Sequence, residues 1–276
     1  YFPEALVGNY GVNPHNGYRY WYDYFEPETP GAPALSDQRA RYREWNHEFE
    51  PCGYTFAMPV VYTWYRTFGW YDFEPKDYRW FYNMMLVTSN AGQHTSQQTP
   101  IIPFVHWHTT APPDNPDPSV EQFSKENYQE LLWHMLLRGH DTFFLWCTGK
   151  ELPTEIQLVH EVYRESLQYS GFIDRGVPVQ FNVPSKPSPV VSGLRLGNRV
   201  LARRTDFGTR TGNETLTLAG GGEVSVAAKR GMQILTVEKK PRHPGILKDH
   251  NGKLRFPIGF YEFPGNKEEL QRMAQS

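Results

Sequence analysis

Residues 100–108 read PIIPFVHWH, and residues 120–147 read VEQFSKENYQELLWHMLLRGHDTFFLWC. The first stretch is an apolar run of strand length. The second stretch begins with a helical pattern and ends with another apolar run, 142–147. Leu131, Leu132, Met135 and Leu136 share one helix face, and Gly139 follows as a typical C-terminal glycine. A strand, a helix and a strand in this order predict one unit of a parallel sheet.

The same alternation extends to both sides of this unit. Strands are expected at 5–12, 54–62, 100–108 and 142–147, and helices at 36–49, 75–92, 120–138 and 152–169. Four strand–helix units in succession predict an α/β chain with right-handed crossovers. We favour a (β/α) TIM-barrel-type segment, complete or partial, over a doubly wound sheet. The strand-to-helix connections are long, and no glycine-rich phosphate loop follows a strand.

The pattern changes after Gly171. Short β-like runs separated by Asn and Gly turns cover 177–183, 190–203, 214–218, 223–228 and 232–237. They predict a small antiparallel β-sandwich domain. We therefore expect a barrel segment over 1–171 and an antiparallel β domain over 172–240. In residues 241–276 we expect a linker up to Gly252, and then a strand at 254–261 and a helix at 266–275 that begin a further strand–helix unit.

Composition argues against several classes of protein. The 28 basic and 30 acidic residues nearly balance, and no basic run exceeds Lys239-Lys240, so we expect no nucleic-acid partner. No apolar stretch reaches membrane-spanning length, so we expect no membrane partner. Two cysteines, Cys52 and Cys147, cannot alone form a disulfide framework or a four-ligand zinc site. We expect no metal and no cofactor.

Aromatic and polar side chains gather where the predicted parallel strands end, which is the working face of a barrel. The candidate substrate-binding residues are Asn9, Tyr10, Tyr62, Trp64, His106, Trp107, His108 and Trp146. A sugar ring has an apolar face and a rim of hydroxyls, so it suits such a platform. A chain with 8 Trp, 17 Tyr and 17 Phe would also place aromatics there by packing alone. The pattern predicts a carbohydrate partner.

Two further groups of residues could carry chemistry. Asp72 and Glu74 are candidate catalytic carboxylates, because glycoside hydrolysis uses a pair of acids. They also precede the helix opened by Pro75, where capping and the helix dipole favour acids. His106 and His108 alternate along one strand and so share a face, which could hold zinc in a metal-dependent hydrolase. The sequence offers no clear third ligand.

Four segments resemble the hyaluronidase family of glycoside hydrolases, in the second half of that family's barrel. They are Val7-Gly8-Asn9-Tyr10-Gly11-Val12, Pro59-Val60-Val61-Tyr62, Ile102-Pro103-Phe104-Val105 and Thr142-Phe143-Phe144-Leu145-Trp146-Cys147. The resemblance implies that Tyr62 and Trp146 line the substrate site. The family's catalytic Asp and Glu would lie before Tyr1, and its disulfides are missing.

The expected function is therefore a glycoside hydrolase-like barrel that acts on or binds a polysaccharide. Alternatives are a non-catalytic carbohydrate-binding or scaffolding segment, and the metal-dependent hydrolase with His106 and His108. The chain does not begin with Met and has no signal-peptide pattern. We expect it to belong with the remainder of a longer parent chain, in an extracellular or periplasmic setting.

Overall fold

The computed structural model describes residues 4–8, 53–62, 76–107, 123–146, 152–184, 188–207, 212–219, 221–238, 247–248 and 254–255. These residues mix helices and strands, so the predicted α/β class is confirmed. The chain divides into two compact units, Tyr1–Glu238 and Lys239–Ser276, which are described separately.

The first unit contains a three-stranded parallel sheet. Its strands are β1 (Val60–Tyr62), β2 (Phe104–His106) and β3 (Phe144–Leu145), in the order β1-β2-β3. Three of the four predicted strands are thus confirmed as parallel neighbours. The remaining predicted strand is 5–12. Its residues 5–8 carry no strand assignment, although Thr55 N donates to Val7 O at 2.7 Å. Residues 9–12 lie outside the described part.

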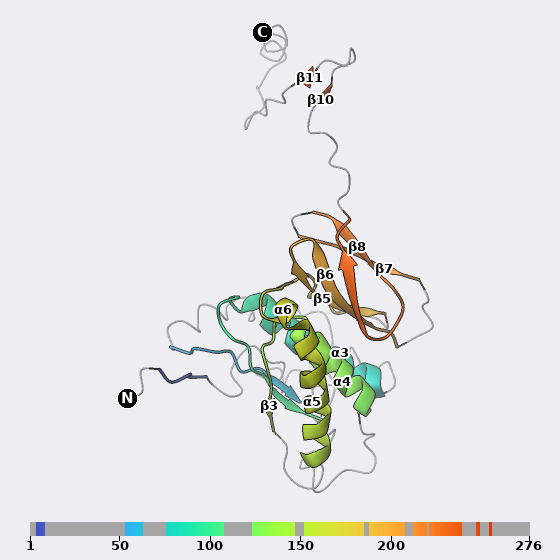
Figure 1. Ribbon diagram of the computed structural model, residues 1–276. Coiled ribbons are helices and arrows are strands. Elements are labelled where there is room, and N and C mark those ends of the chain that lie inside the picture. The colour runs from blue at the N-terminus through green and yellow to red at the C-terminus, as the bar shows by residue number, and fades with distance from the viewer. Residues whose placement is uncertain are drawn as a thin grey trace, which may run out of the picture. The chain divides into compact units, whose positions relative to one another are not determined.

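Three helices follow the strands and lie side by side next to the parallel sheet (Figure 1). They are α3 (Lys76–His94), α4 (Lys125–Leu136) and α5 (Leu152–Ser166). Helix α4 begins five residues later than predicted, at a cap where Asn127 N donates to Ser124 Oγ at 3.3 Å. It ends at Leu136, two residues before the predicted end, and Gly139 after it has φ +91°, a conformation that residues other than glycine rarely adopt. The chain continues from α5 through a short 3₁₀ helix, η2 (Leu167–Tyr169), and then α6 (Ser170–Ile173).

One face of the parallel sheet, with one side chain from each strand, packs against these helices. Val61, Val105 and Leu145 occupy neighbouring register positions and pack into a core with apolar residues of α3, α4 and α5. Close approach of α3 to the end of α4 requires Gly92, because a Cβ there would lie 2.0 Å from Arg138 O. The helix layer therefore packs on a single face of the sheet.

An antiparallel sheet follows. Its strands are β4 (Val177–Pro178), β5 (Val190–Leu196), β6 (Arg199–Thr205) and β9 (Met232–Thr236), in the order β4-β5-β6-β9. A separate hairpin joins β7 (Glu214–Thr217) to β8 (Glu223–Val226). The run predicted at 190–203 is itself a hairpin that turns at Gly197-Asn198.

The two faces of this sheet contact different partners, because side chains alternate along a strand. Val191, Val200 and Ala202 pack with the apolar residues of the β7–β8 hairpin. Leu194 and Leu201 on the opposite face pack with Leu137 and Phe172. Helix α4 consequently lies between the parallel sheet on one side and the antiparallel sheet on the other, as the near-complete burial of its C-terminal half reflects.

In the second unit, β10 (Leu247–Lys248) pairs antiparallel with β11 (Leu254–Arg255). Residues 247–248 fall within the predicted linker, so the linker prediction was wrong at these two residues. A strand at Leu254 was expected, and it is present as one half of a hairpin. The remainder of that expected strand, and the helix at 266–275, lie outside the described residues.

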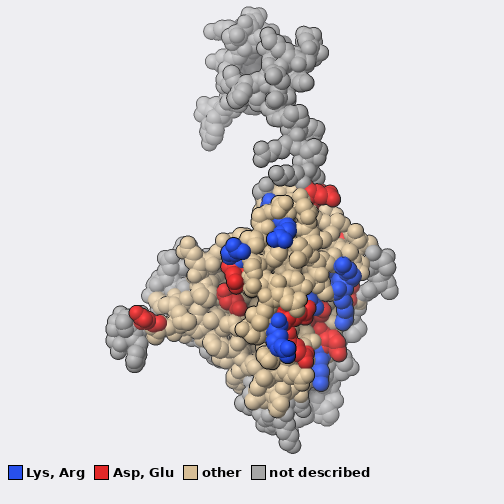
Figure 2. Space-filling view, viewed as in Figure 1, with Lys and Arg blue, Asp and Glu red and all other residues tan. Residues whose placement is uncertain are grey.

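Two further properties of the described residues are helix hydropathy and the distribution of charge on the surface. No helix within the described ranges combines the length and apolar character needed to cross a membrane. On the face shown in Figure 2, described basic and acidic side chains are interspersed, and neither sign forms a large separate patch.

Candidate functional site

Three predicted site residues stand at the carboxyl ends of neighbouring parallel strands. Tyr62 is in register with His106 at the end of β1 and β2. Trp146 N donates to Val105 O at 3.0 Å, which places Trp146 just past β3 and beside His106. The rings of His106 and Trp146 meet edge to face, with centroids 5.2 Å apart and planes at 72°. The structure thus brings His106 and Trp146 together, while the side chain of Tyr62 is not among those described.

The sheet face that carries this ring pair holds further aromatic side chains. Phe104 and Phe144 lie two residues before His106 and Trp146, with ring centroids 5.2 Å apart, and the ring centroids of Phe56 and Phe144 are 6.2 Å apart. Phe104 and His106 point to the same face because they are two residues apart. This face is opposite the helix layer, and Phe144 is exposed on it. We call it the helix-free face, because α3, α4 and α5, the long helices of the described residues, pack on the other face.

The His106 ring is fully buried, whereas Trp146 keeps part of its surface exposed. An edge-to-face contact fixes the orientation of both rings. His106 therefore orients the Trp146 indole, and Trp146 as a residue is partly exposed.

Trp107 points to the other face of β2. It is buried, its Nε1 donates to Phe123 O at 2.8 Å, and its ring lies 6.5 Å from that of Tyr128. This places Trp107 in the core between β2 and α4, so its role in substrate binding stays a prediction. Of the other candidate site residues, those that lie outside the described part are Asn9, Tyr10, Trp64, Asp72, Glu74 and His108.

Glu155 is a buried carboxylate at the same end of the sheet, and sequence reasoning did not single it out. Its Oε1 accepts from Trp107 N at 3.0 Å and from the Tyr128 hydroxyl at 2.7 Å. One side chain in the first turn of α5 therefore ties the end of β2 to α4. In sequence it looks like an ordinary acid near a helix N-terminus, where the dipole favours negative charge, so no local signal marks its burial.

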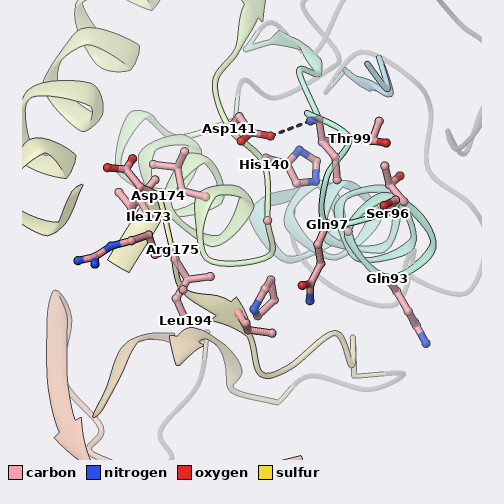
Figure 3. A pocket seen from close by; sticks show the side chains of 18 of the residues that line it. Gln93, Ser96, Gln97, Thr99, His140, Asp141, Ile173, Asp174, Arg175 and Leu194 are labelled. Carbon is pink, nitrogen blue, oxygen red and sulfur yellow. Dashed lines mark hydrogen bonds between the residues drawn. The ribbon is translucent and has the colours of Figure 1, made fainter. Parts of the chain in front are cut away.

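The amino ends of the strands present a different site, a polar-lined cavity of about 320 Å³ (Figure 3). Asp141, just before β3, accepts a 2.8 Å hydrogen bond from Ile101 N, drawn as the dashed line. Burial raises the pKa of Asp141, and that hydrogen bond partly offsets the rise. Asp141 thus joins the segments that lead into β2 and β3.

His140 lines the same cavity. Burial lowers its pKa to about 4; its hydrogen bond to Thr88 O opposes this change, and the nearby Arg138 adds to it. The ring is therefore neutral at pH 7, and Nε2 donates to Thr88 O at 3.1 Å. The hydrogen bond of His140 joins the end of α4 to α3, so His140 and Asp141 each make a contact between segments of the fold.

A buried polar network links α4 to the antiparallel sheet, and its hydrogen bonds determine the tautomer of His134. Thr205 Oγ1 donates to Glu130 Oε2 at 2.6 Å, so it accepts from His134 Nε2–H at 3.0 Å. Nδ1 then accepts from the Ser192 hydroxyl at 2.7 Å. Burial, with Arg138 and Arg203 nearby, holds the pKa of His134 well below its ordinary value. The ring is neutral, and both of its nitrogens are hydrogen-bonded.

The two arginines complete this network. Arg203 pairs with both carboxylate oxygens of Glu130, at 2.7 and 2.8 Å, and lies over the Trp133 ring. Arg138 Nε donates to Ser192 Oγ at 2.8 Å. A bidentate buried pair with satisfied neighbours stabilises one geometry. These contacts hold the antiparallel sheet against α4, and Glu130 and Arg203 also line a small pocket of about 230 Å³.

Metal chemistry and known relatives give no further constraint. Within the described ranges, no group of three or more His, Cys, Asp or Glu side chains is arranged to hold a metal ion. No family model, curated protein or solved structure matches the chain.

Proposed function

We propose that the parallel strands belong to a (β/α) TIM-barrel-type domain that binds a polysaccharide at their carboxyl ends, as a glycoside hydrolase-like protein. Two features of the fold support the barrel. The strands follow one another in sequence order, and their helices all pack on one face. A doubly wound sheet reverses its strand order and covers both faces; the described strands show no such reversal.

The observation that carries the binding proposal is the His106–Trp146 ring pair. It lies at the carboxyl ends of two adjacent strands, on the helix-free face, and Trp146 is partly exposed. An oriented, partly exposed indole offers a flat apolar surface for a sugar ring, and barrel enzymes bind their substrates at this end. The long strand-to-helix segments after β1 and β2 begin at the same place.

Hydrolysis would need a second element beside this platform, a pair of carboxylates about 5–10 Å apart. Glu155, the carboxylate described at this end, already bonds Trp107 N and the Tyr128 hydroxyl. The acids of a hydrolase would therefore be Asp72 and Glu74, or residues supplied by the remainder of a longer parent chain. Without such a pair the same platform makes a non-catalytic carbohydrate-binding segment.

The test is carbohydrate binding by the chain and by two variants. We expect Trp146→Ala to weaken binding of an oligosaccharide by about 1–3 kcal/mol, as the loss of an aromatic hot spot does. Tyr163→Ala, which removes an exposed aromatic from α5 away from the strand ends, should bind like the wild type. Affinity would be measured by calorimetry against glycosaminoglycan, plant and algal oligosaccharides.

Reducing-end release by the same proteins separates the enzyme from the binding segment. Turnover abolished by Glu74→Gln would assign the acid, and binding without turnover would identify a binding segment. A folded Trp146→Ala variant with unchanged affinity would contradict the proposed site.

A further inference from the structure

An apolar groove of about 600 Å³ lies beside the third parallel strand. Strand β3 and the residues before it form one wall, and α5 with α6 forms the other. Its volume is in the range of small-molecule sites, about 300–1,000 Å³. Neither His106 nor Trp146 lines it. The apolar side chains along it include Phe143, Leu145, Ile156, Val159, Tyr163 and Leu167.

Helix α5 supplies this groove with a second apolar stripe. Leu158 and Val162 belong to its buried stripe, which packs on the core beneath the helix. Ile156 and Tyr163 lie outside that stripe and are exposed. They are two helical turns apart, which is about 10 Å along the helix axis. A surface helix needs a single apolar stripe to pack on its own core, so the second stripe is available to an apolar ligand of about this length.

The groove has a polar end that carries two carboxylates. Asp141 comes just before β3, and Asp174 comes just after α6. Both residues also line the cavity at the amino ends of the strands, where Figure 3 labels them. The groove therefore adjoins that cavity at these two carboxylates, and its apolar walls lead away from them along α5.

These carboxylates are without a countercharge in the described part of the chain. Asp141 accepts a hydrogen bond from Ile101 N, but neither Asp141 nor Asp174 makes an ion pair with a described side chain. The described residues that line the groove include no Lys or Arg, and His160, which stacks with Tyr163, is the one of a basic type.

This arrangement determines which charge an occupant should carry. An apolar or anionic occupant would remove water from unpaired carboxylates, which costs free energy. Burial already raises the pKa of Asp141, and a nearby positive charge acts in the opposite direction. The groove is therefore complementary to a ligand with an apolar body and a cationic end that donates hydrogen bonds.

We propose that the β3–α5 groove binds a small amphiphilic organic cation. Its apolar body lies along the second stripe of α5, and its protonated amine lies at the end marked by Asp141 and Asp174. The site is separate from the proposed carbohydrate surface and does not depend on it.

The test is the affinity of the full chain for three probes that share an octyl chain, measured by calorimetry up to about 3 mM probe. The probes are octylamine, octanol and octanoate. We expect protonated octylamine to bind about tenfold more tightly than octanol, because hydrogen bonds between charged groups add about that factor. Octanoate should bind more weakly than octanol, because like charges repel.

Three variants locate the binding. The double variant Asp141→Asn with Asp174→Asn should remove the preference for octylamine over octanol. Its matched control, Glu126→Gln with Glu165→Gln, removes two exposed charges outside the groove and should retain the preference. Tyr163→Ala removes an exposed ring from the groove wall and should weaken binding of octylamine and octanol alike, with unchanged far-ultraviolet circular dichroism.

Equal affinity of the wild type for octylamine and octanol, or no binding of octylamine, would overturn the proposal. A preference that persists in the double Asn variant would also overturn it, as would unchanged octylamine affinity in folded Tyr163→Ala. Oligosaccharide binding on the same samples separates the two proposals. Amine binding without oligosaccharide binding would count against the proposed function alone, and the reverse would count against this inference alone.

Discussion

The two ends of the parallel strands differ in the chemistry that they carry. At the amino ends, the side chains of Asp141 and His140 each form a hydrogen bond with a backbone group of a neighbouring segment, and burial shifts the pKa of both. At the carboxyl ends, the rings of His106 and Trp146 are in contact, and Trp146 is partly exposed. Asp141 and His140 at the first end join neighbouring segments of the fold, and the aromatic side chains at the second end are the proposed binding surface. Loss of stability and loss of binding should therefore separate in mutants.

The largest expected effect is on stability, in the network that joins α4 to the antiparallel sheet. Glu130→Ala leaves Arg203 buried without its partner and should lower the free energy of unfolding by about 3–5 kcal/mol. Urea unfolding followed by circular dichroism measures this loss. Glu126→Ala removes an exposed acid from the first turn of the same helix and should cost much less. Equal losses in the two variants would contradict a structural role for the network.

The next effect is the pH dependence of stability. It tests the role of the amino ends, because a histidine held neutral by the fold stabilises the protein only while it stays neutral. The pKa of His140 is about 4 in the fold, against 6.5 as the ordinary value. Between these values the unfolded chain binds more protons, so the stabilisation is complete above pH 6.5 and is lost as pH falls toward 4. The shift corresponds to about 3 kcal/mol, and His134 contributes in the same direction.

Denaturant unfolding at a series of pH values checks this slope. His140→Gln should flatten it. The raised pKa of Asp141 acts with the opposite sign, but it is present in both proteins and cancels in the comparison. A slope identical in His140→Gln and the wild type would show that His140 is not held neutral by the fold.

A smaller loss of stability is expected at Asp141. Asp141→Ala removes the acceptor for Ile101 N and should cost about 1–3 kcal/mol. Asp141→Asn retains an acceptor oxygen at that position and should cost less. Both variants should bind oligosaccharide as the wild type does, because the cavity is at the opposite end from Trp146. Weakened binding in folded Asp141→Ala would break the division between the two ends.

Local patterns in the sequence predicted the elements that rest on local physics. Helix α4 follows from the spacing of its leucines and from Gly139, and the parallel strands follow from short apolar runs between helices. The boundaries were less exact, because Ser124 caps α4 inside a stretch that already looked helical. The hairpin β10–β11 was missed because Leu247-Lys248 has no strand pattern until it pairs with Leu254-Arg255.

The long-range polar contacts could not be predicted from local pattern. Glu130, His134 and Arg138 recur at intervals of four and look like a solvent-facing stripe. Their partners Ser192, Arg203 and Thr205 come more than fifty residues later. The stripe is buried because a second sheet covers it. For the candidate site, the sequence did place His106 and Trp146 at adjacent strand ends, since parallel strands end at one edge of a sheet. It also grouped Trp107 with them, although the alternation along β2 turns that side chain to the other face.

The most direct test of the proposed function is a crystal structure of the chain with a bound oligosaccharide selected by calorimetry. The account predicts a sugar ring stacked on the exposed part of Trp146, on the helix-free face, at the carboxyl ends of β2 and β3. A sugar bound in the cavity at the amino ends, against Asp141 and away from Trp146, would contradict it.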